Sequence, residues 1–503
     1  MFSRFFRAIL SRFQGKIDRR TPQVKYPNIQ HSLHDYHNKT TSTPPTSAPN
    51  LERRSSPGLE ALERQREISE DPYDLESTAD GKKLLTAFKA GKNIFLTGSG
   101  GTGKSFLIRK LIRRCNPKAI AISASTGIAA VNIEGKTLHK TLGIGLGPKR
   151  DESFDDFEAW LECGPMGKQH LAAIKRFSHR NVLFIDEISM INERLFDFVE
   201  YRLRKLKGNN LPFGGVQLVV IGDFSQLEPV EKSPFEPKFA FVSASWQKAN
   251  FETIYLKKVF RQEDPGFIEL LARIRLGEQT QADLDKLSSR ILKPRDASVT
   301  RVLTHNEMVD RYNKAQLAKI ESEPTTFIAE IEGGTVEQRK ELIRNILSPE
   351  ILTLKVGAKV MFTANSPKDK FFNGEVGYVD SIYSSGMKHF FEEGFVMVTK
   401  EGEKTPVKVE PYTWYADRDN FKAARMTQIP LRLAYAITVH KSQGATLTEA
   451  HVDISRCFAR GQAYVALSRV TGLSGLTLEE FSPNVIRTHQ KCVNFYKELD
   501  ASM

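Results

Sequence analysis

The chain has 503 residues, long enough for about three domains and a large apolar core. It contains 73 Lys and Arg against 60 Asp and Glu, a formal net charge of +13. This excess favours a polyanionic partner, nucleic acid first and an anionic membrane surface second, although a solvated basic surface would also produce it. No run of eighteen apolar residues occurs, so no membrane span is predicted. The four cysteines lie far apart and form no CxxC pair, which argues against a disulfide framework or zinc site and favours a reducing compartment.

The first segment, MFSRFFRAILSRFQGK, places apolar side chains at helical spacing with Arg and Lys between them, and no acid precedes Asp18. An Arg-rich, acid-poor amphipathic helix is typical of a mitochondrial targeting segment. We therefore expect a mitochondrial location, with the nucleus as the alternative. A membrane-surface anchor, or a helix that packs on the body of the protein, would also explain the pattern.

The rest of the chain divides by composition. Residues 20–72 are rich in Pro, Ser, Thr and Asn without apolar periodicity, so 1–72 is expected to hold the targeting helix and a disordered linker. Strand and helix patterns alternate from about Leu75 to Gly208 and resume at Gln217, which predicts an α/β fold with parallel sheets. Residues 355–425 contain short alternating runs separated by Gly and polar turns, and predict a small β-barrel inserted into a second α/β unit.

A phosphate-binding loop is predicted at GSGGTGKS, between an apolar strand and an apolar-periodic helix. Glycines at these positions let backbone N–H groups cradle phosphate oxygens at a helix N-terminus, whereas a Gly-rich helix cap is the structural alternative. Lys104 would reach the β- and γ-phosphates, and Ser105 would ligate Mg²⁺. The predicted nucleotide-binding residues are Gly98, Ser99, Gly100, Gly101, Thr102, Gly103, Lys104 and Ser105.

Two further strands end in polar residues suited to the same site. The strand VLFI, residues 182–185, ends in Asp186 and Glu187, which would hold Mg²⁺ and deprotonate the attacking water, respectively. Alone, such a pair is commonly a helix N-cap, but beside a phosphate-binding loop it indicates catalysis. The strand at 217–221 precedes Asp223 and Gln226, and a neutral Gln that donates and accepts can sense the γ-phosphate. A turn-capping Gln is the alternative.

Taken in order, these motifs and others resemble the Pif-type (petite integration frequency) DNA helicases, RecD-like members of helicase superfamily 1B. The matching segments cover about residues 90–480 and are GSGGTGKS, ASTGIAAVNIEGKTLHKTLGIG, DEISMI, GGVQLVVIGDFSQLEPV, FAFVSASW, VFRQED, LTHNEMVD, LKVGAKVMF, NGEVGYV, PLRLAYAITVHKSQGATL and GQAYVALSRV. The resemblance implies two RecA-like domains with ATP between them, a Src-homology-like inserted barrel and a small wedge. The expected ranges are 73–245 for the first domain with its wedge at about 143–170, 246–354 and 426–503 for the second domain, and 355–425 for the barrel.

The resemblance also implies roles for single residues. Arg261 and Arg469 match arginines that reach across the cleft to the γ-phosphate, where closure of the cleft ties hydrolysis to domain motion. Gly444 matches a position near both nucleotide and DNA. The residues that match motifs tracking single-stranded DNA are Thr137, His139, His305, Asn306, His440, Lys441 and Ser442. Hydroxyl, imidazole and ammonium donors suit phosphate oxygens without reading base identity.

The implied function is that of an ATP-driven helicase that moves 5′→3′ on single-stranded DNA, with a 5′-tailed duplex as substrate and genome maintenance as its role. Family substrates extend to forks, G-quadruplexes and RNA–DNA hybrids, and a monomer on DNA is expected. Two alternatives are a RecD-like motor subunit that works only within a larger complex, and a nucleotide-gated scaffold that binds nucleic acid without turnover. The scaffold is disfavoured because all six predicted catalytic residues are intact: Lys104, Asp186, Glu187, Gln226, Arg261 and Arg469.

The chain departs from the family pattern at two positions. Glu228 in QLEPV stands where the family shows Pro, and we expect this to loosen the turn behind Gln226 without abolishing activity. Ala79 in LESTA stands where the family has an adenine-reading Gln. We therefore expect weaker discrimination between ATP and other nucleoside triphosphates.

This loss of an adenine contact is testable by steady-state kinetics. Without a side-chain amide at position 79, the values of kcat/KM for ATP and GTP should agree within about tenfold, because one missing hydrogen bond to a ligand commonly changes affinity by that order. A preference for ATP of several hundredfold would contradict the prediction.

Overall fold

The computed structural model describes residues 75–502 except 146, 165, 230–235, 237, 295, 297–298, 367–369, 384–393 and 417–421. The expected targeting helix and linker, residues 1–72, lie outside the described residues. Among the helices that are described, none is long and apolar enough to cross a membrane.

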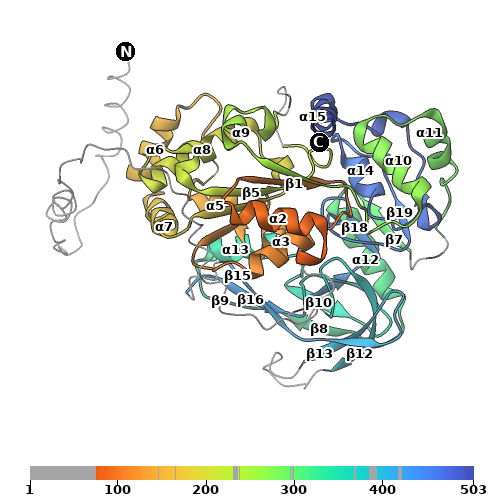
Figure 1. Cartoon of the computed structure of the whole chain (residues 1–503). Coiled ribbons are helices and arrows are strands. Elements are labelled where there is room, and N and C mark those ends of the chain that lie inside the picture. The colour runs from red at the N-terminus through yellow and green to blue at the C-terminus, as the bar shows by residue number, and fades with distance from the viewer. Residues whose placement is uncertain are drawn as a thin grey trace, which may run out of the picture. The chain divides into compact units, whose positions relative to one another are not determined.

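The first domain is built on a six-stranded parallel sheet with the order β3-β2-β4-β5-β1-β6 (Figure 1). Its strands are β1 (Ile94–Gly98), β2 (Ile120–Ala124), β3 (Lys136–Thr137), β4 (Val182–Asp186), β5 (Gln217–Ile221) and β6 (Glu252–Leu256). Every residue of β1, β4 and β5 is buried, as expected for central strands of a sheet covered on both faces.

Helices cover both faces of this sheet because side chains alternate along each strand. Ile94, Leu96 and Phe184 share a core with α2 (Ala79–Lys89) and α3 (Lys104–Arg113), whereas Phe95 and Leu183 face α8 (Glu193–Lys207). The remaining helices of this domain are α4 (Gly127–Asn132), α5 (Leu138–Leu142), α6 (Phe154–Cys163), α7 (Gly167–Phe177) and α9 (Ala244–Ala249). The pair α6 and α7 overlaps the range expected for the wedge and continues to Phe177, and its role as a wedge stays a prediction.

The second domain contains a four-stranded parallel sheet with the order β18-β7-β19-β20. Its strands are β7 (Thr300–Leu303), β18 (Ala436–Thr438), β19 (Ala450–Val452) and β20 (Leu476–Leu478). Their apolar side chains form one core with α10 (Pro265–Leu276) and α14 (Gln462–Leu467). The other helices around this sheet are α11 (Gln281–Ser288) and α12 (Asn306–Ala318).

Antiparallel strands fill the stretch between β7 and β18. A five-stranded sheet has the order β14-β13-β12-β11-β17, and smaller sheets pair β10 with β8 and order β15-β16-β9. These strands are β8 (Thr325–Ile328), β9 (Glu330–Glu332), β10 (Ile351–Leu354), β11 (Lys359–Phe362), β12 (Val376–Tyr383), β13 (Phe395–Lys400), β14 (Pro406–Val409), β15 (Tyr412–Tyr415), β16 (Arg425–Gln428) and β17 (Leu431–Leu433). Helix α13 (Val336–Asn345) packs against β16.

The antiparallel region is wider than the range 355–425 expected from the sequence. It begins at β8, because Phe327 and Leu354 share one apolar core with the five-stranded sheet. The short strands β8 and β9 are mostly exposed, so they give no strong apolar alternation in the sequence. Closure of these strands into a barrel stays a prediction.

The boundaries of the two domains also differ from the ranges expected from the sequence. Strand β6 pairs with β1, so the first domain extends past residue 245 to Leu256. The C-terminal helix α15 (Gln490–Ala501) follows the second domain in sequence, yet Cys492 and Tyr496 are buried in the core of the first domain. The first domain therefore contains a helix supplied from the far end of the chain.

Candidate nucleotide site and nucleic-acid interface

The phosphate-binding loop lies where β1 ends and α3 begins. The N-cap of α3 is Gly103, with a left-handed φ of 84°, and Gly101 has a φ of 83°. A Cβ added to Gly101 would lie only 2.6 Å from the Cβ of Arg261, so both backbone shape and space require glycine there. The Nζ of Lys104 donates to the carbonyl oxygens of Gly98 and Ser99 at 2.7 and 2.9 Å. The loop thus has the local geometry predicted for phosphate binding.

A cavity of about 340 Å³ extends from this loop to the second domain. It gathers predicted residues that are separated by hundreds of positions in the sequence. Those that line it are Gly100, Gly101, Thr102, Gly103, Lys104, Ser105, Asp186, Glu187, Gln226, Arg261, His440, Gly444 and Arg469. Register explains the meeting of the first-domain residues, because Leu96 pairs with Ile221 and Ile185 with Val220, which aligns the carboxyl ends of β1, β5 and β4.

Two acids meet at the end of β4. Asp186 accepts the backbone N–H of Glu187 at 2.9 Å, and Glu187 has a left-handed φ of 54°, a strained conformation for a residue with a side chain. Burial raises the pKa of Asp186 to about 6. Burial, together with the charge of Asp186, raises the pKa of Glu187 to about 8. These acids therefore lack sufficient compensating charge from the protein alone.

A magnesium ion fits this set of donors. Ser105 and Asp186 both line the cavity and offer hydroxyl and carboxylate oxygens, the hard ligands that Mg²⁺ prefers. The raised pKa of the buried Asp186 is the expected signature of a carboxylate whose charge a cation would stabilise.

The two arginines approach the phosphate-binding loop from the second domain. Arg261 donates to Thr446 Oγ1 at 3.1 Å and to the carbonyl oxygen of Ser468 at 3.2 Å. Arg469 donates to Ser468 Oγ at 2.7 Å, and a Cβ added to Gly100 would lie 3.4 Å from its Nη2. Burial lowers the pKa of Arg261 to about 9 and that of Arg469 to about 10. Both arginines thus line the phosphate cavity, in a setting that favours an anion.

Gln226 lies between the two domains. Its Nε2 donates to Asp223 Oδ2 at 3.3 Å, and its Oε1 accepts from Nε2 of Gln443 in the second domain at 3.4 Å. One amide group therefore contacts each side of the cleft. This arrangement suits a γ-phosphate sensor better than a turn cap.

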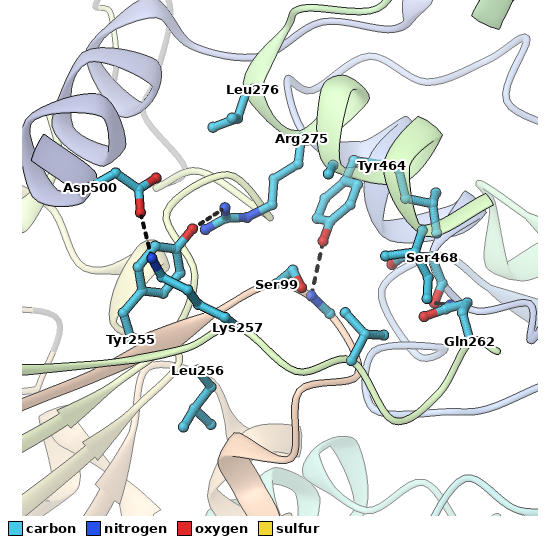
Figure 2. Close-up of a pocket in the computed structure, with 15 residues that line it drawn as sticks. Ser99, Tyr255, Leu256, Lys257, Gln262, Arg275, Leu276, Tyr464, Ser468 and Asp500 are labelled. Atoms are coloured by element: carbon cyan, nitrogen blue, oxygen red, sulfur yellow. Dashed lines mark hydrogen bonds and ion pairs between the residues drawn. The ribbon is translucent and has the colours of Figure 1, made fainter. Parts of the chain in front are cut away.

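Several site residues were not predicted from the sequence. Gln443 is part of the HKSQG segment, but its amide is informative only beside Gln226. The hydroxyl of Tyr464 accepts the backbone N–H of Gly100 at 2.9 Å, which ties α14 to the phosphate-binding loop (Figure 2). Phe260 is 62% exposed, and a Cβ added to Gly103 would lie 3.8 Å from its ring. Its position directly before Arg261 in the VFRQED segment was the signal available in the sequence.

The residues expected to contact DNA lie at the carboxyl edges of both sheets. Leu303 pairs with Thr438, so His305 and Asn306 after β7 lie near His440 and Lys441 after β18, and all four are at least partly exposed. His305 also contacts Thr304 Oγ1 through its Nδ1 at 2.7 Å.

In the first domain, Thr137 is the last residue of the edge strand β3, and His139 lies in the helix α5 that follows. Thr137 caps α5 by accepting the N–H of Lys140 at 3.4 Å. His139 lines a separate cavity of about 660 Å³ together with Arg150 and Arg194. The lining also includes Lys238 and three acids, Glu193, Asp197 and Glu236, so the cavity offers room for a nucleic-acid backbone but no net positive charge.

Ser442 is the exception among these residues. It is fully buried, and its hydroxyl donates to the carbonyl oxygen of Val439 at 2.7 Å. The structure therefore corrects the expected DNA contact, since this side chain shapes the loop after β18 and does not reach its surface.

Two parallel sheets that enclose one phosphate-binding cavity, with arginines supplied from the opposite side, define a P-loop NTPase with two RecA-like domains. The family model for PIF1-like helicases matches residues 82–285. The chain is 36% identical to the ATP-dependent DNA helicase PIF1 of Emericella nidulans, covering 83% of this chain and 62% of the relative. It is 32% identical to the ATP-dependent DNA helicase Pif1 of Bdellovibrio bacteriovorus, covering 85% of this chain and 93% of the relative. The chain therefore belongs to the PIF1-like helicase family.

Solved structures agree with this assignment. The Pif1 helicase of Candida albicans matches with a TM-score of 0.66 and 35% identity, covering 84% of this chain and 99% of that one. Bacteroides sp Pif1 in complex with ADP-AlF4 matches with a TM-score of 0.70 and 29% identity, covering 84% and 97%. Bacteroides Pif1 bound to ssDNA matches with a TM-score of 0.56 at the same identity and coverage. These likenesses confirm the predicted family and its two RecA-like domains, whereas the chain spans only about three fifths of the length of the fungal and vertebrate relatives.

The contact between Gly461 and Gln226 yields a prediction for the site. Gly461, the N-cap of α14, has a φ of 75°, and a Cβ there would lie 1.9 Å from the carbonyl oxygen of Gln226. Gly461→Ala should displace the Gln226 loop and lower kcat for ATP hydrolysis by about tenfold or more, since small displacements of positioned groups have effects of that size. Gly402→Ala is the matched control, because Gly402 has a φ of 82° with no atom within 4 Å of the added Cβ. Equal rates for the two variants would contradict the prediction.

Proposed function

We propose that this chain is an ATP-dependent DNA helicase that moves 5′→3′ along single-stranded DNA and opens duplexes carrying a 5′ tail. The observation that carries the proposal is the meeting of Lys104, Arg261 and Arg469 around one cavity between two RecA-like domains. Relatives named ATP-dependent DNA helicase PIF1 support the activity, and a Bacteroides relative bound to ssDNA supports the substrate. The direction of movement comes from the family resemblance.

Each residue of the cavity has a defined task in this mechanism. Lys104 and the backbone amides of the phosphate-binding loop bind the phosphate chain, and Glu187 accepts the proton of the attacking water. Arg261 and Arg469 neutralise charge that develops on the transferred phosphoryl group. Mg²⁺, which Ser105 and Asp186 would hold, supplies further charge neutralisation at the phosphates.

Movement along DNA follows from the bipartite construction of the site. The arginines assist hydrolysis only while the second domain is closed on the first, so each turnover opens and closes the cleft. The exposed polar residues after β7 and β18 move with the second domain, and those after β3 move with the first. Alternating grip by these two sets on phosphate oxygens would carry the protein along one strand without reading its sequence.

Paired unwinding assays test this proposal. The full chain should unwind a duplex with a 5′ overhang and leave the matched 3′-overhang duplex intact, and single-stranded DNA should stimulate its ATP hydrolysis. Lys104→Ala should lower hydrolysis by at least about 100-fold because it removes a phosphate-binding cation. Lys286→Ala, at an exposed position on α11, should leave it unchanged. Unwinding from 3′ overhangs would refute the proposed direction, and hydrolysis with no response to DNA would refute the helicase.

We further propose that residues 1–40 direct the protein to mitochondria, on the basis of the Arg-rich, acid-poor pattern of the first sixteen positions. A fluorescent protein fused to this segment should co-localise with a mitochondrial marker. Replacing Arg4, Arg7 and Arg12 by Glu should abolish that localisation, because acidic residues oppose import of such segments. A diffuse or nuclear signal from the unchanged segment would refute the proposal.

A further inference from the structure

A buried ion pair joins the two domains behind the phosphate-binding loop. Arg275 donates to the two carboxylate oxygens of Asp223 at distances of 2.9 to 3.1 Å, and the two residues are 4% and 0% exposed. Asp223 follows β5 of the first domain, whereas Arg275 lies on α10, whose apolar face is buried in the core of the second domain. Burial opposes the charge of Asp223, yet the guanidinium holds its pKa below the usual range. The pair is therefore a charged connection between domains.

Asp223 in turn orients the sensor loop, which is the segment of residues 223–226 after β5. It accepts the backbone N–H of Ser225 at 3.2 Å and the side-chain amide of Gln226 at 3.3 Å. Because Arg275 fixes the carboxylate and the carboxylate fixes the Gln226 amide, a continuous chain of contacts runs from α10 to the phosphate cavity.

Tyr496 of α15 completes this arrangement. The Arg275 guanidinium lies 4.1 Å from the centroid of its ring. Its hydroxyl, which is fully buried, accepts the N–H of Phe224 at 3.0 Å and contacts Thr97 Oγ1 at 2.9 Å. Phe224 directly follows Asp223, and Thr97 directly precedes Gly98 of the phosphate-binding loop. The Tyr496 hydroxyl therefore connects the sensor loop to β1, the strand that leads into the phosphate-binding loop.

Arg275 lies outside the nucleotide cavity. It lines a second cavity, of about 250 Å³, together with Ser99, Gly100 and Tyr464, and it also donates to the hydroxyl of Tyr255 at 3.0 Å (Figure 2). The phosphate cavity that contains Lys104, Asp186 and Gln226 is lined by neither Arg275 nor Tyr496. Neither residue therefore lines the phosphate cavity, although burial and, to a smaller extent, the charge of Arg275 lower the pKa of Lys104.

We propose that Arg275 and Tyr496 are positioning residues for ATP hydrolysis, which set Gln226 for the γ-phosphate according to the placement of α10 of the second domain. When α10 shifts, Arg275 moves the Asp223 carboxylate and, through it, the Gln226 amide. Tyr496 meanwhile holds the sensor loop in a fixed position relative to the end of β1. The inference rests on the proposed ATPase function. It assigns to Arg275 and Tyr496 the role of coupling the position of the second domain to the rate of ATP hydrolysis.

Two conservative variants of the full chain test the inference. Tyr496→Phe removes only the hydroxyl, and Arg275→Lys keeps the charge but loses the multiple contacts of the guanidinium. Each should lower kcat for hydrolysis stimulated by single-stranded DNA by between about 5-fold and 100-fold, as expected for a displaced positioning group. KM for ATP and the affinity for a fluorescent ADP analogue should stay within about twofold, because removal of an interaction made only in the transition state lowers kcat without weakening binding.

Matched controls separate positioning from a general loss of stability. Tyr435→Phe removes another buried hydroxyl that accepts a backbone N–H, that of Lys359 at 3.1 Å. Arg273→Lys alters a neighbouring arginine of α10 that pairs with Asp283 at 2.7 Å within the second domain. Both controls should keep kcat within about twofold while shifting the melting temperature as much as the test variants do.

The possible outcomes decide the matter. An unchanged kcat in Tyr496→Phe or Arg275→Lys, an equal loss of kcat in the controls, or a rise in KM at constant kcat would each overturn the inference. If one test variant does not fold, the other carries the same criterion, and failure of both to fold assigns the pair to stability alone and overturns it as well. An unchanged chain that hydrolyses no ATP with DNA would instead refute the proposed function.

Discussion

The structure depends on holding three cations close together at one place between two domains. Lys104, Arg261 and Arg469 line a single cavity, and burial lowers the pKa of each of them. The neighbouring acids Asp186 and Glu187 have raised pKa values for the same reason. Buried charges of this kind are unfavourable unless each one is paired and hydrogen-bonded. Under the proposed function, a polyphosphate with a divalent cation would supply charge of both signs, so nucleotide binding would offset the desolvation of these groups and draw the domains together.

The carboxyl ends of parallel strands explain why this cavity can form from distant segments. In the first sheet, β1, β4 and β5 end side by side and deliver the phosphate-binding loop, the acidic pair and the sensor loop to one edge. In the second sheet, β18 leads into the segment that holds Gln443 and Gly444. The arginines come from segments that flank this second sheet, so the site is complete only where the two sheet edges face each other.

The sequence predicted the parts of the site whose partners are close in the chain. Glycines, lysine and serine within one octapeptide, or an acidic pair after an apolar strand, are local patterns with a local physical cause. Arg261 and Arg469 were reached only through the family resemblance, because an isolated arginine carries no pattern. Ser442 was assigned to DNA for its place in a motif, and its burial became visible only in the structure.

The missed contacts are those between residues far apart in sequence. The Asp223–Arg275 pair spans 52 positions, and the contacts of Tyr496 with Phe224 and Thr97 span 272 and 399. Neither Arg275 nor Tyr496 stands in a periodic or spaced motif. Helix α15 has the pattern of an ordinary amphipathic helix at the end of a domain. Its placement in the core of the first domain is a tertiary outcome that local propensity does not encode.

Both domains contact the sensor loop, and these contacts affect the unusual residue Glu228. The second domain already contacts the loop through Gln443 and the backbone at Gly461. Glu228 stands where the family pattern has Pro, which would restrict the backbone directly. Burial raises the pKa of Glu228, whereas the charge and backbone N–H of Arg460, the residue before Gly461, oppose that rise. The second domain thus acts on Glu228 as well, through Arg460, although the Oε2 of Glu228 is buried without a hydrogen-bond partner among the described residues. The loop that holds Gln226 is therefore in contact with the domain whose position it must sense.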